Sequence, residues 1–172
     1  VKISHNFAYN TTRTFSMWIK TDNVNDYGVG RGIFGNVGNA SNGYIRIMAR
    51  TSTENGAVSF LVKDNGNAIA AVTGTSNIHD TNWHHIVFVH ILATGEAKVY
   101  VDGILENTQT YLPGSYASIT PDAGNTCIGR YFEANKPVIS NSNDYAWEGS
   151  IDDVRVYDRE LNQAEISAMF NI

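Results

Sequence analysis

Short runs of β-branched and aromatic residues, separated by Gly, Asn and Asp, follow one another along most of the chain. Such runs favour strands, and the residues between them favour turns. The runs cover residues 14–21, 31–37, 43–50, 57–64, 67–73, 83–91, 97–103, 104–110, 126–132 and 150–157. The pattern therefore predicts an all-β chain.

Two of the gaps between runs carry the residues of tight hairpin turns. Asp64-Asn65-Gly66 and Asp102-Gly103 each stand between two runs. Asn-Gly and Asp-Gly supply the positive φ that such a turn requires. Both sites predict antiparallel pairing of the strands on either side.

The end of the chain has a helical pattern instead. Asn162 can cap a helix, and Glu165 follows three positions later. Ile166, Met169 and Phe170 then recur at helical spacing. We expect a short helix that packs against the last strands.

The run 83–91 is apolar on both faces of an extended strand. One face carries Trp83, His85, Val87, Val89 and Ile91, and the other carries His84, Ile86, Phe88 and His90. A strand of this kind belongs in the middle of a sheet that is covered on both sides, or beside a groove.

The histidines of this run do not have metal-ligand spacing. His84 and His90 are six residues apart in the sequence, which is about 20 Å along an extended strand, so one ion cannot bind both. His85 and His79 have no Glu or Cys at a spacing that would complete a tetrahedral site. We interpret these histidines as structural.

Composition favours one domain and excludes several partners. The 172 residues are 42% hydrophobic, which suits a single core over 1–172. The net charge is −5, and the basic residues are scattered, so nucleic acid is not an expected partner. No apolar run approaches the ~20 residues that cross a bilayer, so membrane insertion is not expected. Cys127 stands alone within a strand-like run, which favours a buried thiol.

Four motifs in order carry a family resemblance. They are "FSMWIKT", "WHHIVFVHILATGEAKVYVDGIL", "CIGR" and "WEGSIDDVRVYDRELNQAEISAMF". Together they resemble the laminin-G-like, concanavalin A-like jelly-roll domain in its bacterial and pentraxin-related form, over nearly the whole chain. The resemblance implies a two-sheet antiparallel jelly-roll sandwich with a short C-terminal helix. It also implies one module of a larger secreted or cell-surface protein.

The fold alone does not select a function. The first expectation is a non-catalytic carbohydrate-binding, lectin-like module whose partner is a polysaccharide or glycan. The alternative is a protein-recognition or structural spacer module of an extracellular adhesin, with a cell-surface protein as its partner.

The sequence lacks the motifs of the catalytic members of this fold. Glycanases of this kind carry an E-x-D-x-x-E pattern along one strand, because retaining hydrolysis needs an acid and a nucleophile about 5 Å apart. Here the nearest approach is Glu148 with Asp152, in the closing strand. A G-x-S-x-G elbow and a phosphate-binding glycine loop are also missing from the sequence. We expect no enzymatic activity.

Asp152 is the candidate metal ligand. Strict alternation in "SIDDVRVYD" groups it with Val154 and Val156, so we expect its carboxylate near the apolar side. A carboxylate there needs compensation, which calcium or backbone N–H groups can supply. The resemblance implies a structural calcium held in part by Asp152. The alternative is that Asp152 accepts backbone N–H groups or pairs with an Arg.

The rim loops contain the candidate sugar contacts. Sugars stack on aromatic rings and take hydrogen bonds from amides, carboxylates and guanidinium groups. The candidates are Tyr131, Asn141, Asn143, Asp144 and Tyr145 in the last long loop, with Tyr27 and Arg31 in the first. By contrast, Trp18, Trp83 and Trp147 coincide with positions where the resembled family packs aromatic rings into its core. We expect these tryptophans to be buried.

Overall fold

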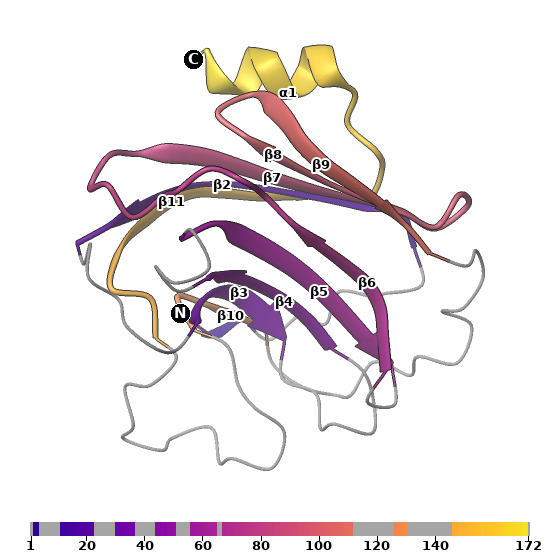
Figure 1. Ribbon diagram of the computed structural model, residues 1–172, viewed down its shortest axis with the longest axis horizontal. Helices are drawn as coiled ribbons and strands as arrows, with labels where there is room; N and C mark the ends of the chain where they lie inside the picture. Colours follow the sequence, from indigo (N-terminus) through magenta and orange to yellow (C-terminus); the bar gives the residue numbers. More distant parts are fainter. Residues whose placement is uncertain are drawn as a thin grey trace.

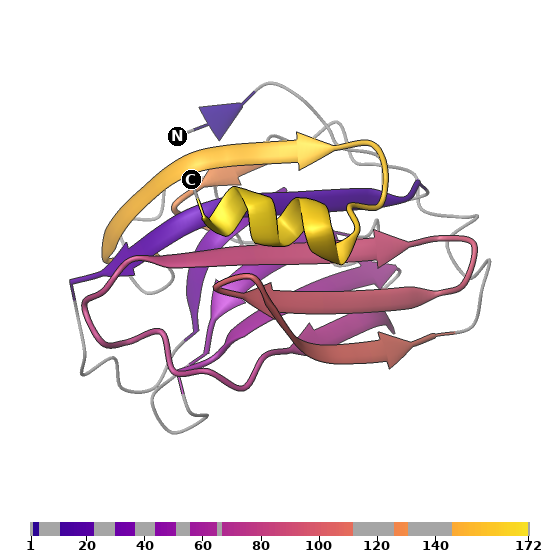
Figure 2. The ribbon, with the colours of Figure 1, turned by 90° about the horizontal axis from the view of Figure 1, so that it is seen from above.

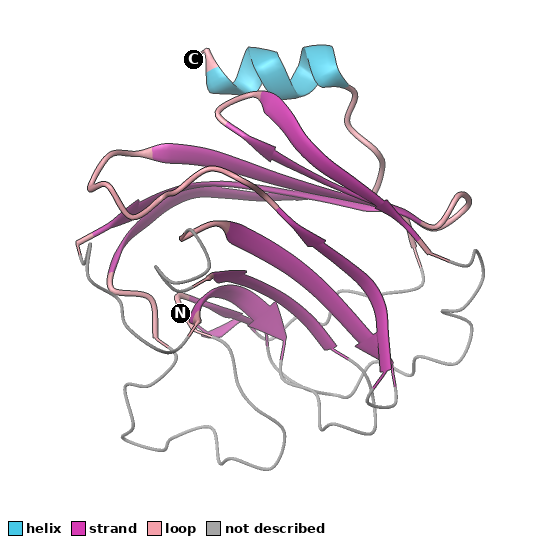
Figure 3. Ribbon diagram, in the orientation of Figure 1, coloured by secondary structure: helices cyan, strands magenta, loops and turns pink. Residues whose placement is uncertain are grey.

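The computed structural model describes residues 2–3, 11–22, 30–36, 44–50, 56–64, 67–111, 126–130 and 146–171. In these ranges two antiparallel sheets face each other, and a helix lies on the outside of one of them (Figures 1 and 3). The predicted all-β jelly-roll sandwich with a short C-terminal helix is confirmed.

Each sheet combines strands from distant parts of the chain. In spatial order, the six-stranded sheet is β1 (Lys2–Ile3), β10 (Thr126–Ile128), β3 (Arg31–Asn36), β4 (Tyr44–Ala49), β5 (Val58–Asp64) and β6 (Asn67–Thr73). The five-stranded sheet is β11 (Gly149–Tyr157), β2 (Arg13–Thr21), β7 (His84–Ile91), β8 (Glu96–Val101) and β9 (Ile104–Thr110). The closing strand β11 thus pairs with β2, near the start of the chain.

Both hairpins form where their turn residues predict them. Strands β5 and β6 pair up to Asp64 opposite Asn67. Strands β8 and β9 are joined through Asp102 and Gly103, whose φ angles are +50° and +77°. Successive positive φ values match the twist of the two strands, which is why Asp-Gly suits this turn.

Aromatic rings from both sheets fill the space between the layers. Phe15 on β2 lies 5.3 Å from Phe34 on β3, measured between ring centroids. Phe60 on β5 stacks on Phe88 on β7 at 5.6 Å. Tilted and offset pairs of this kind stabilise beyond the area they bury. The main core is therefore built by both layers.

The helix α1 (Gln163–Phe170) covers the outer face of the five-stranded sheet (Figure 2). Val87, Val89 and Tyr100 form a second apolar cluster there with Leu161 and Ile166. The strand β7 is consequently buried on both faces, as its composition predicts. Ile86 and Phe88 belong to the main core, whereas Val87 and Val89 face the helix.

Two smaller expectations concern Cys127 and the membrane. Cys127 is buried, as predicted. In the described ranges, no helix combines the length and the apolar character that a membrane span needs.

Candidate functional site

A hollow of about 630 Å³ opens on the outer face of the five-stranded sheet. Its walls are formed by Trp18, Trp83, Asp152, Asp153 and Arg155. We call these five residues the outer groove. They come from β2, from β11 and from the residue just before β7. Trp18 on β2 lies directly opposite Asp152 on β11 and opposite His85 on β7, which brings the three segments together.

The alternation of β2 explains why Trp18 faces outward. Phe15, Met17 and Ile19 enter the core between the sheets. Side chains at alternate positions of a strand point to opposite faces, so Trp18 lies on the other side, where it is partly buried. The same alternation is present in the sequence and is the signal that places Trp18 outside the main core.

A bulge in β11 determines where its acids lie. Asp152 pairs with Trp18 and Arg155 pairs with Ser16, so three steps along β11 match two along β2. Asp153 is the extra residue, and its φ is +48°. A bulge of this kind reverses the alternation beyond it.

The expectation that Asp152 points toward the apolar side is therefore wrong. Asp152 is exposed on the outer face, whereas Val154 and Val156 pack against the core. Its Oδ1 accepts a hydrogen bond from the backbone N–H of Asp153 at 2.8 Å. This is one of the two alternatives to calcium that the sequence leaves open.

The two acids of the groove differ in their partners. The carboxylate of Asp153 forms a two-point ion pair with Arg155, in which Nε lies 2.8 Å from Oδ1 and Nη2 lies 2.7 Å from Oδ2. The guanidinium is thus already engaged by a carboxylate. No cationic side chain of the described residues pairs with Asp152.

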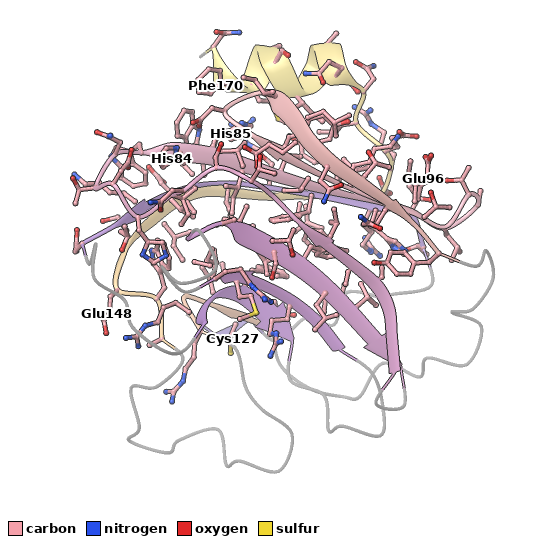
Figure 4. All side chains as sticks on the ribbon, viewed as in Figure 1. His84, His85, Glu96, Cys127, Glu148 and Phe170 are labelled. Atoms are coloured by element: carbon pink, nitrogen blue, oxygen red, sulfur yellow. The ribbon has the colours of Figure 1, made fainter. Side chains whose placement is uncertain are left out.

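An aromatic stack on the outer face of the sheet packs against Trp18. The ring of Trp18 lies 5.2 Å from that of His85 and 5.9 Å from that of Phe170, and His85 also stacks on Phe170 at 6.5 Å. Figure 4 shows Phe170 on α1 above His85 on β7. The helix therefore completes the site by fixing the indole of Trp18.

His85 is buried within this stack. It is 1% exposed, and its Nε2 lies 2.9 Å from the hydroxyl of Ser16. Burial, the largest influence, lowers the pKa of His85. Its Nδ1 has no hydrogen-bond partner among the described residues.

His84 holds the segment that carries Trp83. Its Nδ1 lies 2.8 Å from Oδ2 of Asp102 and its Nε2 lies 3.0 Å from Oδ1 of Asp80. Burial opposes the charged imidazole, but the hydrogen bonds to these two carboxylates outweigh it and raise the pKa of His84. We call His84, Asp80 and Asp102 the histidine clamp.

The carboxylates of the clamp also hold the backbone. Asp80 accepts hydrogen bonds from the backbone and the side chain of Asn82, each at 2.8 Å. Burial would raise the pKa of Asp80, yet these bonds and His84 lower it to about 2. Asp102 accepts the backbone N–H of His85 at 2.9 Å. Trp83 is therefore flanked by anchored residues although it is 43% exposed.

The expectation for the three tryptophans is correct only for Trp147. It is 8% exposed and belongs to the main core. Trp83 is exposed, so its predicted burial is wrong, and Trp18 packs outside the main core. Trp83 precedes β7 at the sheet end, where the covering helix reaches only as far as Phe170.

Most of the predicted sugar contacts lie outside the described residues. They are Tyr27, Tyr131, Asn141, Asn143, Asp144 and Tyr145. Arg31 is described, and its Nη2 pairs with Oε1 of Glu148 at 3.1 Å. This ion pair joins β3 to the residue before β11, and sugar binding by Arg31 stays a prediction.

The described residues do not build a calcium site around Asp152. Among them, no group of three His, Cys, Asp or Glu side chains is placed to hold a metal ion. Calcium binding by Asp152 stays a prediction. The structural interpretation of His79, His85 and His90 agrees with their burial.

Comparisons with known proteins agree with this architecture. The family model described as the concanavalin A-like lectin/glucanases superfamily matches residues 1–167. Comparison with curated protein sequences finds no significant match.

Several solved structures share the fold at low sequence identity. A heptameric SAP-like pentraxin from Limulus polyphemus superposes with a TM-score of 0.70 at 17% identity, covering 98% of this chain and 74% of that chain. The botulinum neurotoxin DC binding domain, in complex with rat synaptotagmin II, has a TM-score of 0.64 at 18% identity, with coverage of 95% and 36%. Botulinum neurotoxin type C, whose cell entry depends on interaction with two ganglioside molecules, has a TM-score of 0.63 at 22% identity, covering 95% of this chain and 37% of that chain. The chain thus spans little more than a third of these toxin chains.

Proposed function

Because the chain belongs to the concanavalin A-like lectin/glucanases superfamily, we propose that it is a non-catalytic carbohydrate-binding module whose ligand occupies the outer groove. The observation that carries this proposal is the exposed indole of Trp83 beside a hollow that also presents Asp152, Asp153 and Arg155. An exposed, anchored aromatic ring next to polar groups is the arrangement that sugar recognition requires.

Each part of the groove suits one part of a sugar. A pyranose ring has an apolar C–H face, which can stack on the indole of Trp83 or on the exposed part of Trp18. Its hydroxyls can donate to the carboxylates of Asp152 and Asp153 and accept from Arg155. The aromatic stack and the histidine clamp hold these groups in place before the ligand arrives, which lowers the entropy cost of binding.

The two acids of the groove raise the question of catalysis. Glycoside hydrolysis requires one carboxyl group that gives its proton to the leaving oxygen when the bond breaks. Both oxygens of Asp153 accept from the guanidinium of Arg155. Asp152 faces solvent, and its Oδ1 accepts a backbone N–H. Oxygens that serve as acceptors suit the binding of sugar hydroxyls better than the donation of a proton.

The relatives support the class of partner. Cell entry of botulinum neurotoxin type C depends on two ganglioside molecules, and the binding domain of neurotoxin DC forms a complex with synaptotagmin II. We propose a polysaccharide or glycan as the partner and a secreted or cell-surface multidomain protein as the setting. The rim residues Tyr27, Arg31, Tyr131, Asn141, Asn143, Asp144 and Tyr145 remain proposed additional contacts. If Tyr131→Ala or Tyr145→Ala kept full glycan retention, the proposal of these additional rim contacts would be wrong.

Retention in gels that contain polysaccharides tests the outer groove. The wild-type chain should be retarded by at least one polysaccharide, and Trp83→Ala should abolish the retardation. Leu105→Ala is the matched control, because Leu105 is 45% exposed and lies outside the groove. Migration of Trp83→Ala like the wild type, or no retention by any polysaccharide, would overturn the proposal.

A second candidate function has its own observation. Ile104 and Leu105, at the start of the edge strand β9, are 68% and 45% exposed. Exposed apolar side chains on a sheet edge favour protein recognition. A surface protein that binds the wild type and Trp83→Ala, but not Ile104→Ser, would favour this role, as a protein-recognition or structural spacer module, over the first.

A further inference from the structure

Resting on the function proposed above, we propose that the outer groove takes an amino sugar with a protonated amine, as in polymers of glucosamine, and that Asp152 determines this specificity. Its carboxylate would bind the ammonium group of the sugar. Three features favour such a ligand: the charges that line the groove, the partners of each charge, and the aromatic faces beside them.

The charged groups of the groove do not cancel. Its walls carry two carboxylates and one guanidinium. Arg155 is committed to Asp153 through two contacts of 2.8 and 2.7 Å. Asp152 accepts the N–H of Asp153, a neutral donor, and no cation among the described residues matches its negative charge. Within the part of the chain that the structure describes, the groove therefore has one anionic position without a cationic partner.

A ligand that covers Asp152 must compensate its carboxylate. Covering an exposed carboxylate removes part of its hydration, which costs free energy unless a donor or a cation replaces the water. A sugar hydroxyl replaces one hydrogen bond, whereas an ammonium group replaces it with a charge-assisted one. A sulfated or uronic sugar would add a second negative charge, so anionic glycans are disfavoured.

The aromatic walls favour the same sign of charge. A cation above the face of an indole ring is attracted by the electron density of that ring. Trp18 lies directly opposite Asp152 across the β2 and β11 pair. An ammonium group bound to Asp152 would consequently lie beside the Trp18 indole. The carboxylate and the ring are independent observations that point to a cationic ligand.

The other charged groups on this face do not reverse the preference. Lys20 shares the outer face with Trp18, two positions along β2, but it does not line the groove. The charge of His84 is matched by Asp80 and Asp102. Burial lowers the pKa of His85, which disfavours its charged form.

Calorimetric titration with matched oligosaccharides tests the proposal. The probes are an oligomer of glucosamine, the same oligomer with every amine N-acetylated, and an oligomer of uronic acid. All are measured at one mildly acidic pH and low salt, so that the protein charges are constant. The wild type should bind the glucosamine oligomer about fivefold more tightly than the acetylated one, and the uronic oligomer least. Added salt should reduce the first difference.

Variants assign the preference to one residue. Asp152→Asn should weaken binding of the glucosamine oligomer about fivefold and leave the acetylated oligomer within about twofold of the wild type. Asp158→Asn is the control, because it removes the same charge from an exposed acid that does not line the groove. It should change neither affinity by more than about twofold.

The outcomes separate this inference from the proposed function. Equal affinity of the wild type for the first two oligomers would overturn the amine preference, and so would equal losses in the two Asp variants. If Trp83→Ala still abolished binding in that case, the carbohydrate-binding function would stand. No binding of any of the three oligomers would overturn the amine preference, and the proposed function would then stand only if gels with another polysaccharide retarded the wild type. Unchanged binding by Trp83→Ala would overturn both. The comparison of oligomers on the wild type does not depend on the folding of any variant.

Discussion

The indole ring of Trp18 stacks on the phenyl ring of Phe170, with 5.9 Å between centroids and 22° between ring planes. The two residues lie near opposite ends of the chain, on β2 and at the end of α1. Phe170 also lies against Gly103, where a Cβ would approach its side chain to 3.4 Å. The last turn of the helix thus packs against Trp18, one of the residues that line the groove.

Replacing Phe170 should affect both stability and binding. Phe170→Ala removes a half-buried ring and its stacking on Trp18 and His85, so we expect a loss of roughly 1–2 kcal/mol in the free energy of unfolding. Glycan retention should weaken because Trp18 loses its support. Urea unfolding and gel retention measure the two effects. Phe170→Tyr keeps the ring and should resemble the wild type, and full retention by Phe170→Ala would contradict the supporting role.

The histidine clamp should stabilise the fold more at low pH than at high pH. The folded-state pKa of His84 is raised above its ordinary value of 6.5. Its contribution is therefore fully present below pH 6.5 and is lost as the pH rises through the folded value. His84→Gln should reduce stability below pH 6.5 and flatten the decline toward pH 8. Thermal melting of both proteins across this range measures the difference, and parallel curves would contradict it.

His90 should produce the opposite dependence at lower pH. Burial, with a smaller opposing hydrogen bond to the backbone of Thr11, lowers the pKa of His90 from 6.5 to about 4. The unfolded chain binds a proton between these values and the folded chain does not, so stability falls as the pH falls through this window. At about 1.4 kcal/mol for each pH unit, the loss reaches roughly 3 kcal/mol.

A substitution isolates the contribution of His90. His85, whose pKa is also lowered, acts in the same direction, and Asp80 titrates below the window with a pKa of about 2. His90→Gln should remove most of the decline in denaturant midpoint between pH 6.5 and pH 4. A decline equal to that of the wild type would show that another group causes it.

The cap of α1 should contribute measurably to stability. Oδ1 of Asn162 accepts the backbone N–H of Glu165 at 3.0 Å, and Oε2 of Glu165 accepts the backbone N–H of Asn162 at 2.8 Å. Asn162→Ala should cost about 1 kcal/mol of unfolding free energy, and Asn162→Asp, which keeps the acceptor, should cost little. Chemical denaturation compares them. An equal loss in both variants would rule out capping as the cause.

Much of the fold could be predicted because local and global preferences agree. The Asp102-Gly103 turn has the positive φ values that its residues favour, and the capping box around Asn162 forms as its spacing predicts. The two apolar faces of β7 are covered by the main core and by α1. In each case the physical signal lies within a few neighbouring residues.

The outer groove could not be predicted in the same way. It depends on the pairing of three strands that are far apart in the sequence, and on a bulge at Asp153 that the regular alternation of "SIDDVRVYD" does not indicate. Trp83 carries no local sign of exposure, because the residues that follow it are histidines and apolar side chains. For Trp18, the alternation with Phe15 and Met17 is a usable signal.

The bulge at Asp153 has a consequence for how a surface of this kind can arise. Among the described strands, β11 is at the edge of its sheet and pairs only with β2. A change of register in β11 therefore disturbs a single pair of strands. Deletion of the extra residue at the bulge would move the side chain of Asp152 to the opposite face of the sheet and so remove it from the groove. The other strands of the sandwich would keep their pairing. Recognition could therefore be gained or abandoned within this architecture by the insertion or deletion of a single amino acid.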